Sequence, residues 1–377
     1  MHCRRSDRKL LACVSAAVLG ALLVLGPATA MADGRGGDVY VMTNQSSGNA
    51  VMVFHRDANG MLTLSGTFAT GGNGAGTGAD PLASQGAIVL SEDERFLFAV
   101  NAGSNSISAF TVSGDQLNLH STVPSGGVMP VSVTVRHGLV YVVNAGGTPN
   151  ISGFHLDPYT NQLAPLAGSS RNLPGGAAAG PAEISFSPDG GVLVVTEKNT
   201  NRIDTFVLDD RIPVRVASFP SLSTTPFGFD FGRDDATIVS DAGAGSGTAA
   251  VSSYEVEENG HVTILSPPVG DAQSAACWIA VLRNGRFAYT ANAGSGTISS
   301  YSVSERGKLT LKQAVAASTG NGSTPTDMAL NRSSRFLYVR DGGNGAVDGF
   351  RIESDGSLTP LGTVPGVPAG SQGIAAR

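Results

Sequence analysis

The stretch "SQGIAA" (residues 371–376) closely matches "SQGAIV" (residues 84–89), although the two are almost a whole chain apart. In both, Ser-Gln-Gly precedes a short run of small and apolar residues, which is typical of a short buried β-strand. The later copy stands alone, without the remainder of the segment that follows the earlier copy. We interpret it as one strand of a repeat that the two ends of the chain complete together, so the repeats form a closed ring.

The repeat itself is a β-rich run that ends in Asn, Asp or Glu. Examples are "VYVVNAGG" (residues 140–147) and "AYTANAG" (residues 288–294), and the run recurs about every 50 residues. One aromatic residue follows each run at a similar distance, which confirms the register. The final residues of the runs, called anchors below, are Asn44, Asn101, Asn144, Glu197, Asp241, Asn292 and Asp341, and the aromatics are Phe54, Phe110, Phe154, Phe206, Tyr254, Tyr301 and Phe350.

Each repeat has the same internal order of four short strand-like segments. An apolar run and a polar turn come first, then the anchor segment, the aromatic segment and a fourth segment such as "LTPL" (residues 358–361). This order predicts an all-β fold, a seven-bladed β-propeller with four antiparallel strands per blade. The first repeat starts at "DVYVMTN" (residues 38–44) and lacks its inner strand. The C-terminal strand is therefore expected to complete blade one and close the ring, which removes the open sheet edge.

The first 32 residues differ from the rest. A basic segment (residues 1–9) precedes 17 apolar residues and then the small-residue sequence "PATAMA" (residues 27–32). This pattern predicts a secretory signal peptide over residues 1–32, followed by one propeller domain over residues 33–377. The alternative is a single membrane anchor, because 17 residues just reach the length of a span. With a cleaved signal, the protein is periplasmic or secreted.

Charge and cysteine content narrow the partners. The net charge is −6 and no basic run follows the signal, which argues against nucleic acid and anionic membranes as partners. Cys3 and Cys13 leave with the signal peptide, so Cys277 has no intramolecular disulfide partner. We expect a monomer without stable membrane insertion after cleavage, acting on a small-molecule substrate or ligand.

The anchors "YVVNAGG" (residues 141–147) and "YVMTN" (residues 40–44), the turn "FSPDGG" (residues 186–191) and the outer "LTPL" strand (residues 358–361) resemble the lactonase family of seven-bladed propellers. That family includes 6-phosphogluconolactonase and carboxymuconate cyclase. The resemblance covers about residues 38–377 and implies lactone hydrolysis. It is weaker evidence for activity than for fold, because propellers carry many functions.

One motif departs from the relatives. Their blade four resembles Gly-Pro-Arg-His followed later by Asn-Glu, and Gly180, Pro181 and Glu197 match it. Ala182 stands in place of the Arg and Glu183 in place of the His. The match supports Glu197 as a site residue, whereas the two replacements argue against the relatives' own phosphosugar chemistry.

In an antiparallel blade, the start of the inner strand and the end of the second strand lie on one face, around the mouth of the central channel. Blade four has the most charged sequence there, "TEKNTNR" (residues 196–202). A carboxylate beside cations suits lactone hydrolysis, as a base for water and as charge that stabilises an oxyanion. We therefore predict Glu197 and Glu183 as catalytic residues. The predicted substrate-binding residues are Lys198, Arg202, Arg171, Gln85, Gln372, Asp327 and Trp278.

Each of these residues could instead have a purely structural role. Anchor side chains commonly cap turns and strand ends, the blade-four charges can form a solvated cluster, and Cys277-Trp278 can be core packing. The Gly-rich loop at residues 71–81 precedes no helix, so it is not expected to bind phosphate. No metal motif is present and no cofactor is expected. The candidates for a divalent cation at the channel mouth are Asp241, Asp327, Asp341 and Asn292.

Two functional hypotheses follow from the sequence. The first is an exported, lactonase-like hydrolase with its site at the channel mouth. The second is a non-catalytic propeller that binds a small molecule, a glycan or a protein. The charge of blade four favours the first, and the loss of the Arg-His pair at Ala182 and Glu183 favours the second.

Overall fold

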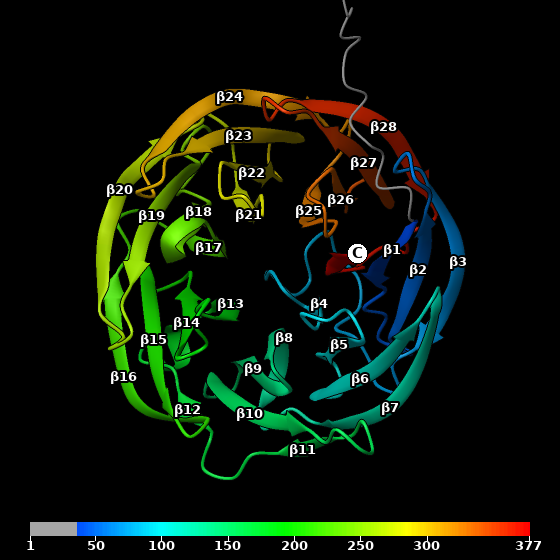
Figure 1. The fold of residues 1–377 in the computed structure, drawn as a ribbon, viewed down its shortest axis with the longest axis vertical. Coiled ribbons are helices and arrows are strands. Elements are labelled where there is room, and N and C mark those ends of the chain that lie inside the picture. Colours follow the sequence, from blue (N-terminus) through cyan, green and yellow to red (C-terminus); the bar gives the residue numbers. More distant parts are fainter. Residues whose placement is uncertain (1–35) are drawn as a thin grey trace, which may run out of the picture. The chain divides into compact units, whose positions relative to one another are not determined.

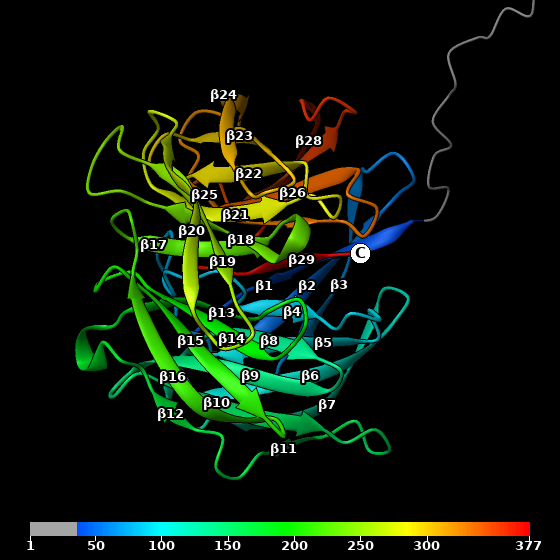
Figure 2. The same cartoon turned by 60° about the vertical axis from the view of Figure 1, so that its left-hand side comes forward.

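The computed structural model describes residues 36–377, so the predicted signal peptide lies outside the described residues. Seven antiparallel sheets are arranged radially around a central axis (Figures 1 and 2). Six sheets have four strands, and the third has a short fifth strand at its rim. The predicted seven-bladed all-β propeller is therefore confirmed. Apart from the strands, the described residues contain only two short 3-10 helices, at Gly176–Ala178 and Arg233–Asp235.

Each blade runs from an inner strand at the channel to an outer strand at the rim. In that order, blade one contains β29 (Ile374–Ala376), β1 (Gly37–Met42), β2 (Ala50–Arg56) and β3 (Leu62–Ala69); blade two β4 (Ile88–Leu90), β5 (Phe96–Asn101), β6 (Ser106–Ser113) and β7 (Gln116–Pro124); blade three β8 (Val128–Arg136), β9 (Leu139–Gly146), β10 (Asn150–Leu156), β11 (Leu163–Pro165) and β12 (Arg171–Asn172); blade four β13 (Pro181–Phe186), β14 (Val192–Glu197), β15 (Arg202–Asp209) and β16 (Ile212–Pro220); blade five β17 (Pro226–Phe231), β18 (Ala236–Asp241), β19 (Ala250–Val256) and β20 (Val262–Gly270); blade six β21 (Ala276–Val281), β22 (Phe287–Asn292), β23 (Thr297–Val303) and β24 (Leu309–Ser318); and blade seven β25 (Pro325–Leu330), β26 (Phe336–Asp341), β27 (Ala346–Ile352) and β28 (Leu358–Pro365).

The second strand of each blade lies in the core. Strand β5, for example, is buried along its whole length, whereas the outer strand β3 is largely exposed. A strand covered on both faces needs a continuous apolar sequence, which explains why the anchor runs were so recognisable. The seven repeat aromatics lie on the third strands, are at most 2% exposed and pack between neighbouring sheets.

The ring closes through the two ends of the chain. Strand β29 pairs antiparallel with β1, with Tyr40 opposite Ala375, and Figure 2 shows red β29 alongside blue β1. The backbone N–H of Gln372 extends this ladder by donating to the Met42 carbonyl at 2.9 Å. The closing strand predicted from "SQGIAA" is therefore confirmed.

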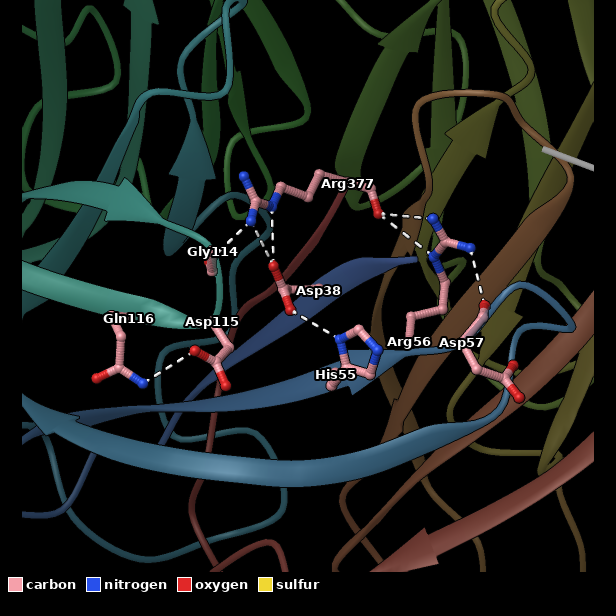
Figure 3. Close-up of polar contacts among 8 residues, drawn as sticks. All are labelled: Asp38, His55, Arg56, Asp57, Gly114, Asp115, Gln116 and Arg377. Carbon is pink, nitrogen blue, oxygen red and sulfur yellow. Dashed lines mark hydrogen bonds and ion pairs between the residues drawn. The ribbon is translucent and has the colours of Figure 1, made fainter. Parts of the chain in front are cut away.

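A polar cluster, shown in Figure 3, secures this closure beyond the last strand. The Arg377 guanidinium donates to Asp38 Oδ2 from Nε at 2.9 Å and from Nη2 at 2.6 Å, and Nη2 also donates to the Gly114 carbonyl of blade two at 2.7 Å. The Arg56 guanidinium donates to the Arg377 carbonyl at 3.3–3.4 Å. Because Asp38 is only 3% exposed, this charge-assisted pair is shielded from water and ties blade one to blade two.

Candidate functional site

We call the face on which the second strands end the upper face, and the opposite face the lower face. On the upper face, the long connection between β3 and β4 crosses the channel; we call residues 71–86 the plug. Figure 1 shows this cyan loop at the centre of the ring. The plug leads into blade two, and hydrogen bonds connect it to each of the other six blades. In the order of blades one, three, four, five, six and seven, these bonds are Gln372 Nε2→Ser84 O (3.2 Å), Ser84 Oγ→Val131 O (2.8 Å), Gln85 N→Ala182 O (3.0 Å), Gln85 Nε2→Phe229 O (3.4 Å), Trp278 Nε1→Ser84 O (2.9 Å) and Arg340 Nη1→Ala79 O (2.8 Å).

Several of the predicted site residues cap the inner strands. An inner strand is a sheet edge, and its unpaired N–H groups need acceptors when they are buried in the channel. Gln85 Oε1 accepts from the Ile279 N–H at 2.9 Å, and Glu183 Oε2 accepts from the Phe229 N–H at 2.7 Å. Burial, together with the nearby acids Asp230 and Asp327, raises the pKa of Glu183 well above its ordinary value despite this bond. Glu183 therefore acts as an edge cap for blade five.

Glu197 does not reach the channel mouth. Its side chain is fully buried, Oε1 accepts from the Gly175 N–H at 2.9 Å, and Oε2 accepts from the Thr200 hydroxyl. Burial and the adjacent Glu197 carboxylate raise the pKa of Asp204, which lies on the next strand. The structure therefore gives Glu197 and Glu183 separate partners and does not bring them to one pocket.

The two arginines predicted for substrate binding also lie elsewhere. Arg202 donates from Nε to the Ser218 hydroxyl at 2.6 Å, toward the outer strand of blade four. Arg171 belongs to β12, which Figure 1 places at the rim, and its guanidinium bonds the carbonyls of Gly168, Ser170 and Pro213. The expected gathering of Glu183, Glu197, Lys198, Arg202 and Arg171 at the mouth is thus not what the structure shows.

Lys198 does reach the mouth, where it meets a residue of the plug. Its Nζ donates to the Pro181 carbonyl at 3.0 Å and lies 5.7 Å from the centre of the Phe227 ring. Burial lowers the pKa of Lys198 to about 8, partly opposed by the charge of Asp80. Burial raises the pKa of Asp80 to about 6, while bonds from Gln372 and the Ala83 N–H and the charge of Lys198 oppose this shift. Both side chains belong to half-buried residues, and they influence each other without forming a direct ion pair.

Arg340 bonds to the plug at Ala79, the residue before Asp80. Its Nη1 donates to Thr326 Oγ1 at 2.5 Å as well as to the plug, but its buried Nε and Nη2 have no protein acceptor. Burial lowers the pKa of Arg340 to about 10, against the charges of Asp80, Asp341 and Asp327. Gln372 Oε1 and Asp327 Oδ2 are likewise buried without a donor. Unpartnered buried polar atoms of this kind need water or a bound group.

Two further predicted residues, Asp327 and Trp278, have structural roles in the channel, and the neighbouring Cys277 is buried with them. Asp327 Oδ1 accepts from the Met328 N–H at 2.9 Å, and burial raises the pKa of Asp327 to about 8. Trp278 packs edge-on against Phe227 and holds the plug through Nε1. Burial raises the pKa of the Cys277 thiol far above its ordinary range, so this thiol is a poor nucleophile.

The anchors proposed as cation ligands serve their own blades. Asp341 Oδ1 accepts from the N–H groups of Thr324 and Gly343, Asn292 donates to the Ser299 hydroxyl, and Asp241 accepts from Ser252. Within residues 36–377, no group of three or more His, Cys, Asp or Glu side chains is placed to hold a metal ion. No helix in that range is long and apolar enough to cross a membrane.

Comparison with known proteins gives the family. The model of the seven-bladed lactonase propellers matches residues 31–174 and 240–371, well over half of the chain. The chain belongs to the lactonase family. No curated protein sequence matches it.

Solved structures share the fold at low identity. A Lactobacillus plantarum protein is 19% identical with a TM-score of 0.72, covering 91% of this chain and 100% of its own. A putative 6-phosphogluconolactonase from Bacteroides fragilis is 15% identical with a TM-score of 0.67, covering 93% and 100%. The Pseudomonas aeruginosa periplasmic gluconolactonase is 17% identical with a TM-score of 0.67, covering 90% and 99%. These similarities establish the fold.

The family model leaves residues 175–239 unmatched, and they contain blade four with Glu183, Glu197 and Lys198. This chain therefore departs from the family pattern in the same blade that has the unusual charges. Sequence reasoning missed Asp80 and Arg340. Arg340 had a readable signal, since it is the one charged residue that directly precedes an anchor. For Asp80, the only signal in the sequence was the length of the Gly-rich loop that contains it.

Proposed function

We propose that this protein is an exported hydrolase of the lactonase family that opens a cyclic ester at the upper face, between Asp80 and Lys198. The observation that carries the proposal is the pair itself, a half-buried carboxylate and a half-buried ammonium whose charges influence each other without a direct ion pair. Their pKa values of about 6 and about 8 leave both groups charged near pH 7. Such a pair combines a general base with an electrostatic stabiliser.

The chemistry follows from the two charges. Asp80 removes a proton from water as the water oxygen attacks the lactone carbonyl carbon, and the Lys198 ammonium stabilises the negative charge that develops on the carbonyl oxygen. The bond to the ring oxygen then breaks, and Asp80 returns its proton to that oxygen. Water and lactone are consumed, and one hydroxy acid is formed.

Export and small-molecule specificity belong to the same proposal. The signal-peptide pattern of residues 1–32 supports export, and a periplasmic gluconolactonase is among the proteins with this fold. We propose that the mature chain acts as a monomer. Because Ala182 and Glu183 replace the basic pair of the relatives, we expect an unphosphorylated lactone as substrate.

The test is hydrolysis of a panel of aldonolactones and simple lactones by residues 33–377. We expect a bell-shaped pH profile of kcat/KM with limbs near pH 6 and pH 8, because activity needs ionised Asp80 and protonated Lys198. Asp80→Asn should reduce kcat/KM at least about 100-fold and remove the acid limb, and Lys198→Met should remove the alkaline limb.

Glu305→Gln is the matched control, because that carboxylate is 81% exposed, far from the mouth. Its rates should equal those of the parent protein. Full activity of Asp80→Asn would refute the assignment of the base, and no turnover of any lactone would refute the hydrolase.

A second candidate function is non-catalytic binding of a hydroxy acid or sugar acid at the same mouth. The plug favours it, because Arg340 and Gln372 are fully buried beneath this loop. Calorimetry with gluconate would identify this case as binding that Arg340→Met weakens, in a protein that hydrolyses no lactone.

A further inference from the structure

The lower face has a cavity that the proposed reaction does not use. It has a volume of about 700 Å³ and lies where blades two and three meet, within the size range of small-molecule sites. Its walls are the turn after β4, the start of β5 and the two lower turns of blade three, and Arg211 of blade four and Arg332 of blade seven extend its rim. It therefore lies on the opposite side of the ring from Asp80 and Lys198.

The lining combines an apolar floor with a basic rim. The floor consists of side chains such as Phe96, Phe98 and Leu139, whereas Arg95, Arg211, Arg332, His137 and His155 contribute cationic or titratable groups. The two acids of the lining are already engaged. Glu92 contacts Arg136 and His137, each at 3.1 Å, and Asp93 accepts from the Ser91 hydroxyl at 2.6 Å. Two of the arginines are paired as well, Arg95 with Asp93 at 3.9 Å and Arg332 with Glu94 at 3.5 Å. The cavity thus offers apolar surface beside a basic rim, on which Arg211 has only its sequence neighbour Asp210 as an acidic partner, at 4.0 Å.

The turns between the third and fourth strands single out the same place. In five of the seven blades, this lower-face turn has a glycine at positive φ. Blades three and four are the exceptions, with Asn161 (φ 59°) and Arg211 (φ 71°) in left-handed conformations. Both of these residues line the cavity. The five glycines are Gly60, Gly114, Gly260, Gly307 and Gly356.

Arg211 is the more costly exception. Asp210 before it also has a positive φ, of 42°, so two consecutive non-glycine residues adopt the conformation that a tight hairpin usually gives to Asn-Gly or Asp-Gly. The Tyr141 hydroxyl donates to the Arg211 carbonyl at 2.7 Å and holds the turn in place. Within the described residues, no acid approaches the Arg211 guanidinium closer than Asp210, at 4.0 Å. Strain of this kind persists where function needs the side chain.

We propose that this lower-face cavity binds an organic carboxylate with an extended apolar body, whose carboxylate is held by Arg211. The apolar body lies against Phe96, Phe98 and Leu139. A guanidinium matches a carboxylate with two parallel hydrogen bonds, and no other residue type at this turn would provide that match. The site does not depend on lactone hydrolysis, and the two proposals are tested independently.

The decisive variant is Arg211→Gly. It creates the favoured Asp-Gly hairpin, so the melting temperature should stay equal or rise. Calorimetric titration with naphthalene-2-carboxylate should show binding to the parent protein and at least about tenfold weaker binding to Arg211→Gly, as expected for loss of one charge-assisted contact. The uncharged naphthalene-2-carboxamide should bind the parent at least about tenfold more weakly than the carboxylate.

Two further variants locate the site. Leu139→Trp fills the floor and should abolish binding, with circular dichroism confirming that it folds. Asp80→Asn, on the upper face, should leave the affinity unchanged. Failure of the parent to bind the carboxylate at millimolar concentration would overturn the proposal. Equal affinity of carboxylate and carboxamide would also overturn it, as would unchanged binding to Arg211→Gly.

Discussion

The upper and lower faces of this propeller are built from the same four-stranded unit and differ in how they are finished. On the upper face, one long loop crosses the channel and bonds to six blades, so polar side chains such as Gln85 and Glu183 are buried as caps of sheet edges. On the lower face, short hairpin turns surround a cavity of about 700 Å³. The repeat therefore determines the ring, while the connections determine what each face can bind.

The pKa values of the carboxyl groups also differ between the channel and upper face and the lower-face turns. In the channel and at the mouth, burial raises the pKa values of Asp80, Asp241 and Asp327 to about 6, 7 and 8. In the lower turns, bonds from nearby N–H and hydroxyl groups lower the pKa values of Asp157 and Asp355. One face thus disfavours negative charge, and the other stabilises it.

The strongest test of the comparison removes residues 370–377, because this segment supports both faces. Gln372 bonds to the plug above, and Arg377 bonds to Asp38 below. Without β29, strand β1 loses its partner and the buried Tyr40 becomes accessible. We expect loss of most of the roughly 5–15 kcal/mol that stabilises a typical domain, seen as loss of a cooperative melting transition.

Ile374→Val is the control for this deletion, since it keeps the strand and should cost only about 1 kcal/mol. A truncated protein that melts at the parent temperature would show that the ring does not depend on its closing strand.

The next test uses pH, because the two groups of carboxyls act in opposite directions. Asp241 and Asp327 keep protons in the folded state that the unfolded chain releases, so stability should fall as pH rises from about 4 to about 8. Asp157 and Asp355 bind protons less readily when folded, so stability should also fall below about pH 4. Urea unfolding at pH 3, 4 and 8 should therefore give the highest stability at pH 4.

Asp327→Asn sharpens this test. Asp327 has φ 67°, which Asn tolerates well, and the amide cannot ionise. The variant should lose less stability between pH 5 and pH 8 than the parent protein. An identical pH dependence in the two proteins would mean that Asp327 does not contribute to it.

The smallest predicted effect concerns one side chain of the plug, that of Gln85. Gln85→Ala leaves the N–H and carbonyl of Ile279 without their side-chain partner, which should cost about 1–3 kcal/mol of unfolding free energy. The same change at the exposed lower-face Gln116 should cost less than about 0.5 kcal/mol. Equal costs at the two positions in chemical denaturation would remove the distinction between the faces.

The fold was predictable because its signals repeat. Seven anchors, seven aromatics and the closing "SQGIAA" strand each constrain the same ring, and the structure confirms them. The candidate site was less predictable because it depends on a single loop with no periodic pattern. The placement of Asp80 is set by contacts of the plug with other blades, and such contacts leave no trace in local sequence.

The misplaced blade-four cluster has a specific cause. Glu197 is the last residue of β14, whereas Lys198 begins the turn that follows, so the two side chains leave the backbone in different directions. Glu197 turns toward Gly175, while Lys198 turns toward Phe227 and the mouth. Adjacent charges in the sequence therefore could not form the single cluster that we expected.

The closing strand also affects how the protein behaves in a crowded solution while it folds. Residues 39–41 pair with residues 374–376. Strand β1 therefore has an unpaired edge until the other blades have formed and the C-terminal strand has docked. The same three residues from a second copy offer this edge identical hydrogen bonds. Strand-exchanged dimers, each with two complete rings, are therefore the expected by-product of refolding at high concentration.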